Sequence, residues 1–172
     1  MKKEISAHLL VLRKDNQEVL LTKRCDIPIW VIPGGHKEAE ETLEEACLRE
    51  FKEETNCTGV IDALVASYIS EDKEIEKHLF IGHATGGLPL PTKESQEVTW
   101  FSVENLPPTL LLYERERIRT CLNFDGSPKK KVYKIHYYKE IRNQLQCPLH
   151  FINLIFNSLS YKIKVGLKFW LI

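Results

Sequence analysis

The chain has 172 residues, and its 24 basic and 24 acidic residues give a formal net charge of zero. This length and composition indicate one soluble globular domain with a sizeable core and room for an appendage. The five cysteines are odd in number and none has Cys-x-x-Cys spacing, which argues against a disulfide framework or a zinc site and favours a reducing cytoplasm.

The balanced charge conceals two parts of opposite sign. Residues 1–122 hold 15 basic and 22 acidic residues, a net charge of −7, whereas residues 123–172 hold nine basic and two acidic residues, a net charge of +7. We therefore divide the chain into a domain over residues 1–122 and a basic, apolar extension over residues 123–172.

The apolar run Ile5–Leu12 and the segment Glu18–Arg24 predict a pair of strands separated by the turn-forming residues Asp15 and Asn16. The apolar piece His8–Leu12 is short and is followed at once by charged residues, so it does not fit the apolar segment of a signal peptide.

A turn and a helix come next. Pro33–Gly35 is turn chemistry that should continue neither a helix nor a strand. Thr42, followed three residues later by Glu45, has the spacing of a capping box. Because Asn readily adopts the left-handed conformation at a helix end, the sequence predicts a helix that begins at Thr42 and ends near Asn56.

Three carboxylates of this helix lie in an unusual place. On a helical wheel Glu50 and Glu54 fall inside the apolar stripe, and Glu53 lies on its border. The stripe itself consists of Leu43, Ala46, Cys47 and Phe51. Carboxylates four residues apart repel each other, and partial burial adds to the cost, so a compensating cation is expected.

The expected cation is Mg²⁺, a hard ion that binds carboxylate oxygens and completes its octahedron with water and phosphate. Glu50, Glu53 and Glu54 would form the cage, together with Glu38 or Glu41 from the preceding loop. Arg49 could orient one carboxylate through a bidentate pair. The alternative is an ordinary acidic helix whose carboxylates are solvated, but the wheel argues against it.

At this point the stretch resembles the signature of the Nudix hydrolases: Gly, five residues, Glu, seven residues, then Arg-Glu-hydrophobic-any-Glu-Glu-any-Gly-hydrophobic. The matching residues are Gly35, Glu41, Arg49, Glu50, Phe51, Glu53 and Glu54. The chain departs from the signature at Asn56, where the family has Gly, and marginally at Cys57, where the family has an aliphatic residue.

The resemblance implies the Nudix fold, an α/β/α sandwich around a mixed β-sheet. It also implies hydrolysis, with Mg²⁺ or Mn²⁺, of a pyrophosphate bond in a nucleoside diphosphate linked to another moiety. By position, Glu53 and Glu54 resemble the principal metal ligands, and Glu50 resembles a ligand or the general base that Arg49 orients. The backbone at Gly35 is a further candidate for the metal site.

The resemblance also suggests residues that contact the substrate. Gly34, Gly35 and Glu41 belong to the signature loop, and Lys23 and Arg24 end the second predicted strand, where they could hold phosphates. The alternative for the two basic residues is that they are surface charges.

The rest of the domain predicts strands at Gly59–Ser70 and His78–Ala84 with a charged turn between them, a loop at Gly86–Pro91, a short strand at Val98–Phe101 and a helix at Leu110–Leu122. Two acidic residues precede the short strand, and a Glu there sometimes binds metal or acts as the base in this family. These further candidates are Glu94 and Glu97. Aromatic residues that could stack on a base, or belong to the core, are Trp30, Tyr68 and Phe80.

The extension begins with a linker at Asp125–Pro128 and the basic run Lys129–Lys131, and a helix is predicted over Val132–Arg142. Lysines interrupt the apolar stretch Phe151–Ile172, so it does not read as a membrane span. Two hypotheses remain for the extension: it packs on the domain or on a second copy and makes a homodimer, or it attaches to an anionic membrane surface.

Several functions stay open. The substrate could be a damaged nucleoside triphosphate, an ADP-sugar, a dinucleoside polyphosphate or a capped RNA end, and the basic extension favours the RNA end. No DNA-binding motif is present. A nucleotide-sensing or scaffold module with a relic site is the alternative outside the enzymes, but the intact set of carboxylates speaks against it.

Overall fold

The computed structural model describes residues 3–71 and 74–133. The elements of this part are β1 (Glu4–Arg13), β2 (Glu18–Arg24), β3 (Trp30–Val31), β4 (Gly34–His36), α1 (Leu43–Thr55), β5 (Cys57–Ser70), β6 (Ile75–Gly87), β7 (Ser95–Ser102), α2 (Leu112–Leu122) and β8 (Lys129–Tyr133). None of the helices among these residues is long and apolar enough to cross a membrane.

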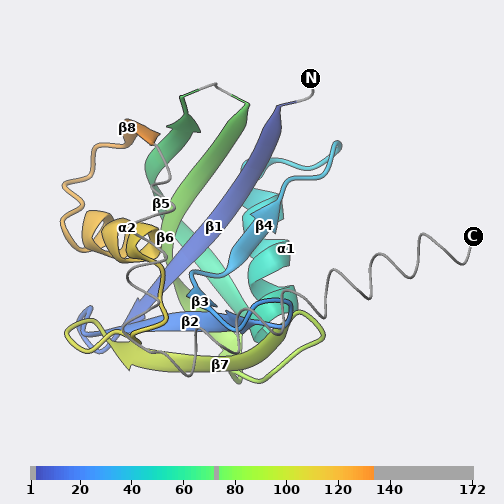
Figure 1. The fold of residues 1–172 in the computed structure, drawn as a ribbon, viewed down its shortest axis with the longest axis vertical. Coiled ribbons are helices and arrows are strands. Elements are labelled where there is room, and N and C mark those ends of the chain that lie inside the picture. The colour runs from blue at the N-terminus through green and yellow to red at the C-terminus, as the bar shows by residue number, and fades with distance from the viewer. Residues whose placement is uncertain (1–2, 72–73, 134–172) are drawn as a thin grey trace, which may run out of the picture.

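The strands form one mixed sheet in the order β3-β2-β1-β6-β5-β8, in which β4 also pairs with β1 and β7 pairs with β2. The β1–β6 and β5–β8 pairs are parallel, and the other pairs are antiparallel. Helices α1 and α2 lie on opposite sides of the central strands (Figure 1). The predicted α/β/α sandwich around a mixed sheet is therefore confirmed.

The continuous apolar run in β1 exists because this strand is buried on both faces. Leu10 and Leu12 pack into the core that includes Ile118 of α2, whereas Leu9 and Val11 pack into the core that includes Phe51 of α1. Neighbouring residues of a strand point to opposite faces, so an unbroken run of apolar residues serves both cores at once.

The prediction that Pro33–Gly35 continues no strand holds for Pro33, which follows the end of β3, but was wrong for the two glycines. Gly34 and Gly35 belong to β4, where they pair in antiparallel register with His8 and Ala7. Gly34 has a φ of +146°, and a Cβ at this residue would lie 2.3 Å from the carbonyl oxygen of Ala7. Glycine thus permits a strand here, because its missing side chain allows a backbone approach that other residues would block.

Other element boundaries differ from the predicted ones. β6 begins at Ile75, inside the predicted charged turn, and continues through Gly87, inside the predicted loop. Pairing with the long strand β5 extends it at both ends.

The basic run Lys129–Lys131 also differs, because it forms a strand with the first two residues of the predicted helix. This strand, β8, pairs in parallel with β5, so the sheet continues past residue 122. Val132 and Tyr133 are therefore not helical, and the rest of that predicted helix and the apolar stretch after it lie outside the described residues.

An ion pair is buried beneath α2. Arg117 is 0% exposed and its Nη1 donates to both carboxylate oxygens of Glu114, at 3.1 and 3.0 Å. The guanidinium also lies 5.9 Å from the ring centre of Tyr68 and 5.3 Å from that of Tyr113. Each charge of the pair is tolerated in the core because the other is present.

We expect Arg117→Met to lower the free energy of unfolding by about 3 to 5 kcal/mol, because the substitution leaves Glu114 buried and unpaired. Adding Glu114→Met should restore much of this loss, since no uncompensated charge then remains in the core. Unfolding by urea measures both effects. A double variant no more stable than Arg117→Met would contradict the account of the pair as mutually dependent.

Candidate functional site

Helix α1 has the ends that the sequence predicts. Thr42 Oγ1 accepts a hydrogen bond from the Glu45 amide at 3.1 Å, and the Glu45 carboxylate accepts one from the Thr42 amide at 2.7 Å. The C-cap, Asn56, has φ 61° and ψ 18°, the left-handed conformation. Asn56 thus supplies the backbone turn for which the Nudix signature has Gly.

The carboxylates of α1 differ in burial as the wheel predicts. Glu54 is only 8% exposed, Glu50 is partly buried, and Glu53 is exposed. Ala46, Cys47 and Phe51 anchor this side of the helix in the core. The helix is therefore fixed with two of its carboxylates turned towards the sheet.

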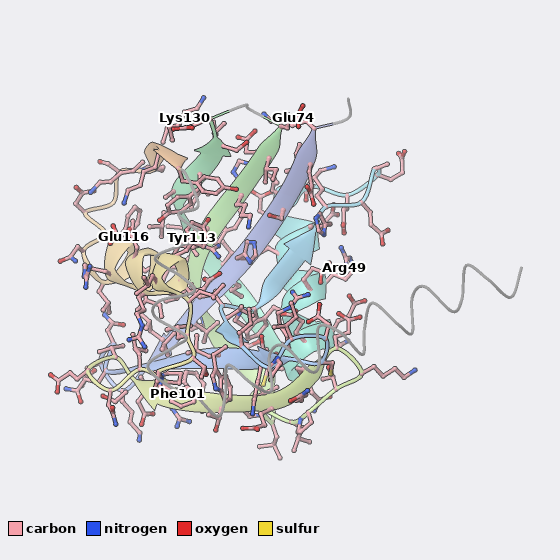
Figure 2. The ribbon with its side chains drawn as sticks, viewed as in Figure 1. Arg49, Glu74, Phe101, Tyr113, Glu116 and Lys130 are labelled. Atoms are coloured by element: carbon pink, nitrogen blue, oxygen red, sulfur yellow. The ribbon has the colours of Figure 1, made fainter. Side chains whose placement is uncertain are left out.

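Arg49 connects the carboxylates of the loop and the helix. Its Nε and Nη2 donate to the two oxygens of Glu41 at 3.1 and 2.7 Å, and its Nη1 donates to Glu50 and to Glu53, each at 2.9 Å. Nη2 also donates to the His36 carbonyl at the end of β4, at 3.0 Å. Figure 2 labels Arg49 next to α1 and β4. This hydrogen bonding lowers the pKa of Glu41 to about 2.

The glycines of β4 bring the sheet against two carboxylates of α1. The amide of Gly34 donates to Glu54 Oε2 at 2.9 Å. A Cβ on Gly35 would lie 2.6 Å from each carboxylate oxygen of Glu50. The missing side chain of Gly35 thus leaves the space that the Glu50 carboxylate occupies. In the sequence, only the spacing of the signature relates these two residues.

Three carboxylates from two segments converge at this place. Glu50, Glu53 and Glu94 each present an oxygen within 4.8 Å of the others. Glu94 comes from the loop before β7, so a residue that the sequence offered only as a further candidate lies with the two from the helix. Glu54 is outside this cluster of three and bonds to Gly34 instead.

The loop that carries Glu94 is attached to the C-terminal end of α1. The Asn56 side-chain amide donates to the Leu88 carbonyl at 3.2 Å, and the Leu90 amide donates to the Thr55 carbonyl at 3.3 Å. At the other end of the loop, Ser95 Oγ donates to the Glu54 carbonyl at 2.6 Å. The helix end therefore positions the loop that faces its carboxylates.

A cavity of about 570 Å³ adjoins the carboxylates. At one end it is lined by Glu50, Glu54 and Glu94, together with Arg24 and the two glycines of β4. Arg24 is held by a bidentate pair with Asp26, at 2.8 and 2.6 Å. The volume lies within the range of ordinary small-molecule sites, so the cavity is large enough for a nucleotide-sized ligand.

The structure places the other candidates away from this cavity. Lys23 pairs with Glu97 at 2.7 Å, and neither residue lines the cavity. Glu38 donates its amide to Glu41, and both lie along a separate shallow groove beside Arg49. Glu41 therefore reaches the cluster through Arg49 rather than directly.

The three aromatic candidates for base stacking belong to the core. Trp30 is 6% exposed, and Tyr68 and Phe80 are each 2% exposed. The stacking interpretation is therefore wrong for all three, because their rings are packed inside the core and cannot reach a base. Residues that the sequence did not single out, Ser6, His8 and Lys77, do line the cavity.

Burial shapes the electrostatics of the inward carboxylates. It raises the pKa of Glu54 to about 7 and also raises the pKa of Glu50, although the bond from Arg49 opposes the rise for Glu50. Both shifts mean that the surroundings supply less positive charge than two ionised carboxylates need. A bound cation would remove this deficit.

Comparison with known proteins relates the chain to one family. The family model for the NUDIX domain matches residues 2–121. A putative 8-oxo-dGTP diphosphatase of Bacillus subtilis is 32% identical over 115 residues, which cover 66% of this chain and 77% of that protein. An ADP-ribose pyrophosphatase of Methanocaldococcus jannaschii is 35% identical over 115 residues, which cover 63% of this chain and 66% of that protein.

Solved structures agree in fold. A NUDIX hydrolase from Nitrosomonas europaea superposes with a TM-score of 0.68 and 22% identity, covering 77% of this chain and 80% of the other. An ADP-ribose pyrophosphatase from Streptococcus suis has a TM-score of 0.64 and 21% identity, covering 76% of this chain and all of the other.

We expect Gly35→Ala to weaken Mn²⁺ binding by about tenfold or more, because the new methyl group displaces the Glu50 carboxylate. The fold should change little, since the atoms that must move are at the end of a side chain. Gly34→Ala is the matched comparison: its methyl group meets backbone, so it should cost more than about 2 kcal/mol of stability. Unchanged Mn²⁺ affinity in a folded Gly35→Ala protein would contradict this reading.

Glu54 also predicts a pH dependence of stability. Because its pKa in the fold is about 7 against an ordinary value of 4.5, the stability associated with its proton is present below pH 4.5 and is lost as the pH rises through 7. Gln cannot ionise. In metal-free protein, the free energy of unfolding of Glu54→Gln should therefore rise relative to that of the native chain by about 3 kcal/mol between pH 4.5 and pH 7.

Denaturant unfolding of both proteins at a series of pH values measures this difference. The opposing titration of His8, whose pKa burial lowers, is common to both proteins and cancels. A difference in stability that does not vary with pH would refute the assignment to Glu54.

Proposed function

Since this chain belongs to the Nudix hydrolase family, we propose that it cleaves a pyrophosphate bond in a nucleoside diphosphate linked to another moiety, using Mg²⁺ or Mn²⁺. The observation that carries the proposal is the convergence of Glu50, Glu53 and Glu94 beside a cavity of nucleotide size.

The donor set fits a hard divalent cation. All three groups of the cluster are carboxylates, two of them are exposed, and among the described residues neither a cysteine nor a histidine joins them. Oxygen ligands with room for water and phosphate suit Mg²⁺ and Mn²⁺, whereas zinc favours sulfur and nitrogen. Glu54 would not bind the cation itself. It would hold strand β4 in place by accepting the hydrogen bond from the Gly34 amide.

Each residue of the site has a part in the proposed reaction. A bound cation would offset the charge of the diphosphate and lower the pKa of a water molecule. Glu50, whose carboxylate lines the cavity, accepts a proton from the attacking water. Arg49 fixes one oxygen of Glu50 through Nη1, and Arg24 faces the cavity where the phosphates would lie.

The relatives support a nucleotide substrate without selecting one. One is named for 8-oxo-dGTP and another for ADP-ribose, so a modified nucleoside triphosphate and an ADP-sugar are both candidates. A dinucleoside polyphosphate or capped RNA remains an alternative. A purely nucleotide-sensing module is disfavoured because the clustered carboxylates, their arginine and the glycine strand are all in place.

The predictions about the location of the protein and about its C-terminal extension remain proposals. We propose a cytoplasmic location, supported by free thiols at Cys25, Cys47, Cys57 and Cys121. The homodimer and the membrane attachment of the extension concern residues that lie mostly outside the described part of the chain.

Glu53→Gln should reduce Mg²⁺-dependent hydrolysis of the best substrate by about 100-fold or more, because it removes a charged ligand and changes the geometry little. Glu44→Gln is the matched control: it makes the same change at an exposed position of the same helix, and should leave the rate near that of the native chain. Chromatography of the products from 8-oxo-dGTP, ADP-ribose and a dinucleoside polyphosphate measures the rates. Equal activity of the two variants would refute the metal assignment.

A further inference from the structure

We propose that Lys77 binds an anionic, phosphate-like group on one of the two groups that the diphosphate of the substrate joins, the nucleoside or the other moiety. The inference rests on the proposed function and extends it: the preferred substrate carries a further negative charge beyond the bond that is cleaved. Lys77 would thus be a residue that determines specificity, at the other end of the cavity from the carboxylates.

The sheet register separates the two ends of the cavity. Ser6 in β1 pairs with His36 of β4 on one side and with Lys77 of β6 on the other. Neighbouring strands are about 4.8 Å apart, so the backbone of Lys77 lies about 10 Å from that of β4. Because the carboxylates of α1 meet the cavity at the glycines of β4, a diphosphate held there would extend its attached group across β1 towards Lys77.

Lys77 is a partly buried cation without a matching anion. Its Nζ lies 5.4 Å from the ring centre of Tyr113 and 6.0 Å from that of Tyr133. Among the described residues it makes no ion pair: Glu114, which attracts it most, already pairs with Arg117, and Glu4, which also attracts it and lines the cavity, contacts His36. Aromatic faces attract a cation but carry no net charge, so an anion entering the cavity could form the ion pair that this lysine lacks among the described residues.

The surroundings of Lys77 suit an oxygen-rich group. Ser6 Oγ and His8 Nε2 lie 3.3 Å apart on the same stretch of β1, and both residues line the cavity. Burial and the nearby Arg117 and Lys77 hold the pKa of His8 well below its usual value, so this ring is neutral and offers one hydrogen-bond donor. No phenylalanine, tyrosine or tryptophan of the described residues lines the cavity. This part of the cavity therefore offers a ligand hydrogen-bonding groups rather than an aromatic surface for stacking.

The first experiment measures binding without hydrolysis. Metal-free protein is titrated calorimetrically with inorganic phosphate at a pH near neutrality. We expect Lys77→Met, which keeps the apolar stem over the tyrosines, to weaken phosphate binding by about tenfold or more, and Lys77→Arg to retain it. The exposed Lys130 of β8 provides the control Lys130→Met, which should bind as the native chain does. Equal affinity of the Lys77→Met and native proteins, or no phosphate binding by the native protein, would overturn the proposal.

The second experiment compares substrates that differ by one phosphate. Dephospho-coenzyme A with coenzyme A, and NADH with NADPH, are such pairs, and each contains a diphosphate. We expect the native chain to have the higher kcat/KM for the phosphorylated member of at least one pair, and Lys77→Met to lose that preference through KM. A preference that survives in Lys77→Met, or that the native chain lacks in both pairs, would contradict the inference.

The two experiments separate this inference from the proposed function. Phosphate binding that depends on Lys77, in a protein that hydrolyses none of the nucleotides, would support the anion site and count against the hydrolase. Hydrolysis that depends on Glu53 but not on Lys77 would support the hydrolase and count against the anion site.

Discussion

The excess of negative charge around Arg49 is the constraint on which the rest of the site depends. One guanidinium contacts Glu41, Glu50 and Glu53 and the carbonyl of His36, so a single positive charge organises three carboxylates. The arrangement is ordered but carries a net negative charge, and Glu54 and Glu94 add to this excess of negative charge. An assembly of this kind is poised to take up cations, because binding relieves repulsion that the fold has already imposed.

Strand β4 determines how closely the sheet approaches the carboxylates of α1. β4 lies between β1 and the carboxylates, and its two glycines allow a close approach on both sides: Gly34 to the backbone of Ala7, and Gly35 to the carboxylate of Glu50. A Cβ at Gly34 would meet the backbone of β1, whereas a Cβ at Gly35 would displace the carboxylate of Glu50. The same strand therefore pairs with β1 and shapes the edge of the cavity.

Local signals in the sequence predicted much of the helix and little of the cavity. The capping box of Thr42, the cap at Asn56 and the inward position of Glu54 follow from contacts within one or two turns, so a helical wheel captures them. Lys77 lies beside the cavity only because β6 pairs with β1, a long-range contact that no local pattern encodes. Trp30 failed as a stacking candidate for a related reason: burial depends on which elements cover a strand.

Asn56 has two tasks, and only one of them is conformational. Its backbone makes the left-handed turn that ends α1, while its side-chain amide bonds to Leu88 in the loop that leads to Glu94. A glycine there would supply the turn without the bond. The departure from the Nudix signature thus gives this chain a side-chain bond between its acidic helix and the opposing loop, so the loop that carries Glu94 is held at a third point besides Leu90 and Ser95.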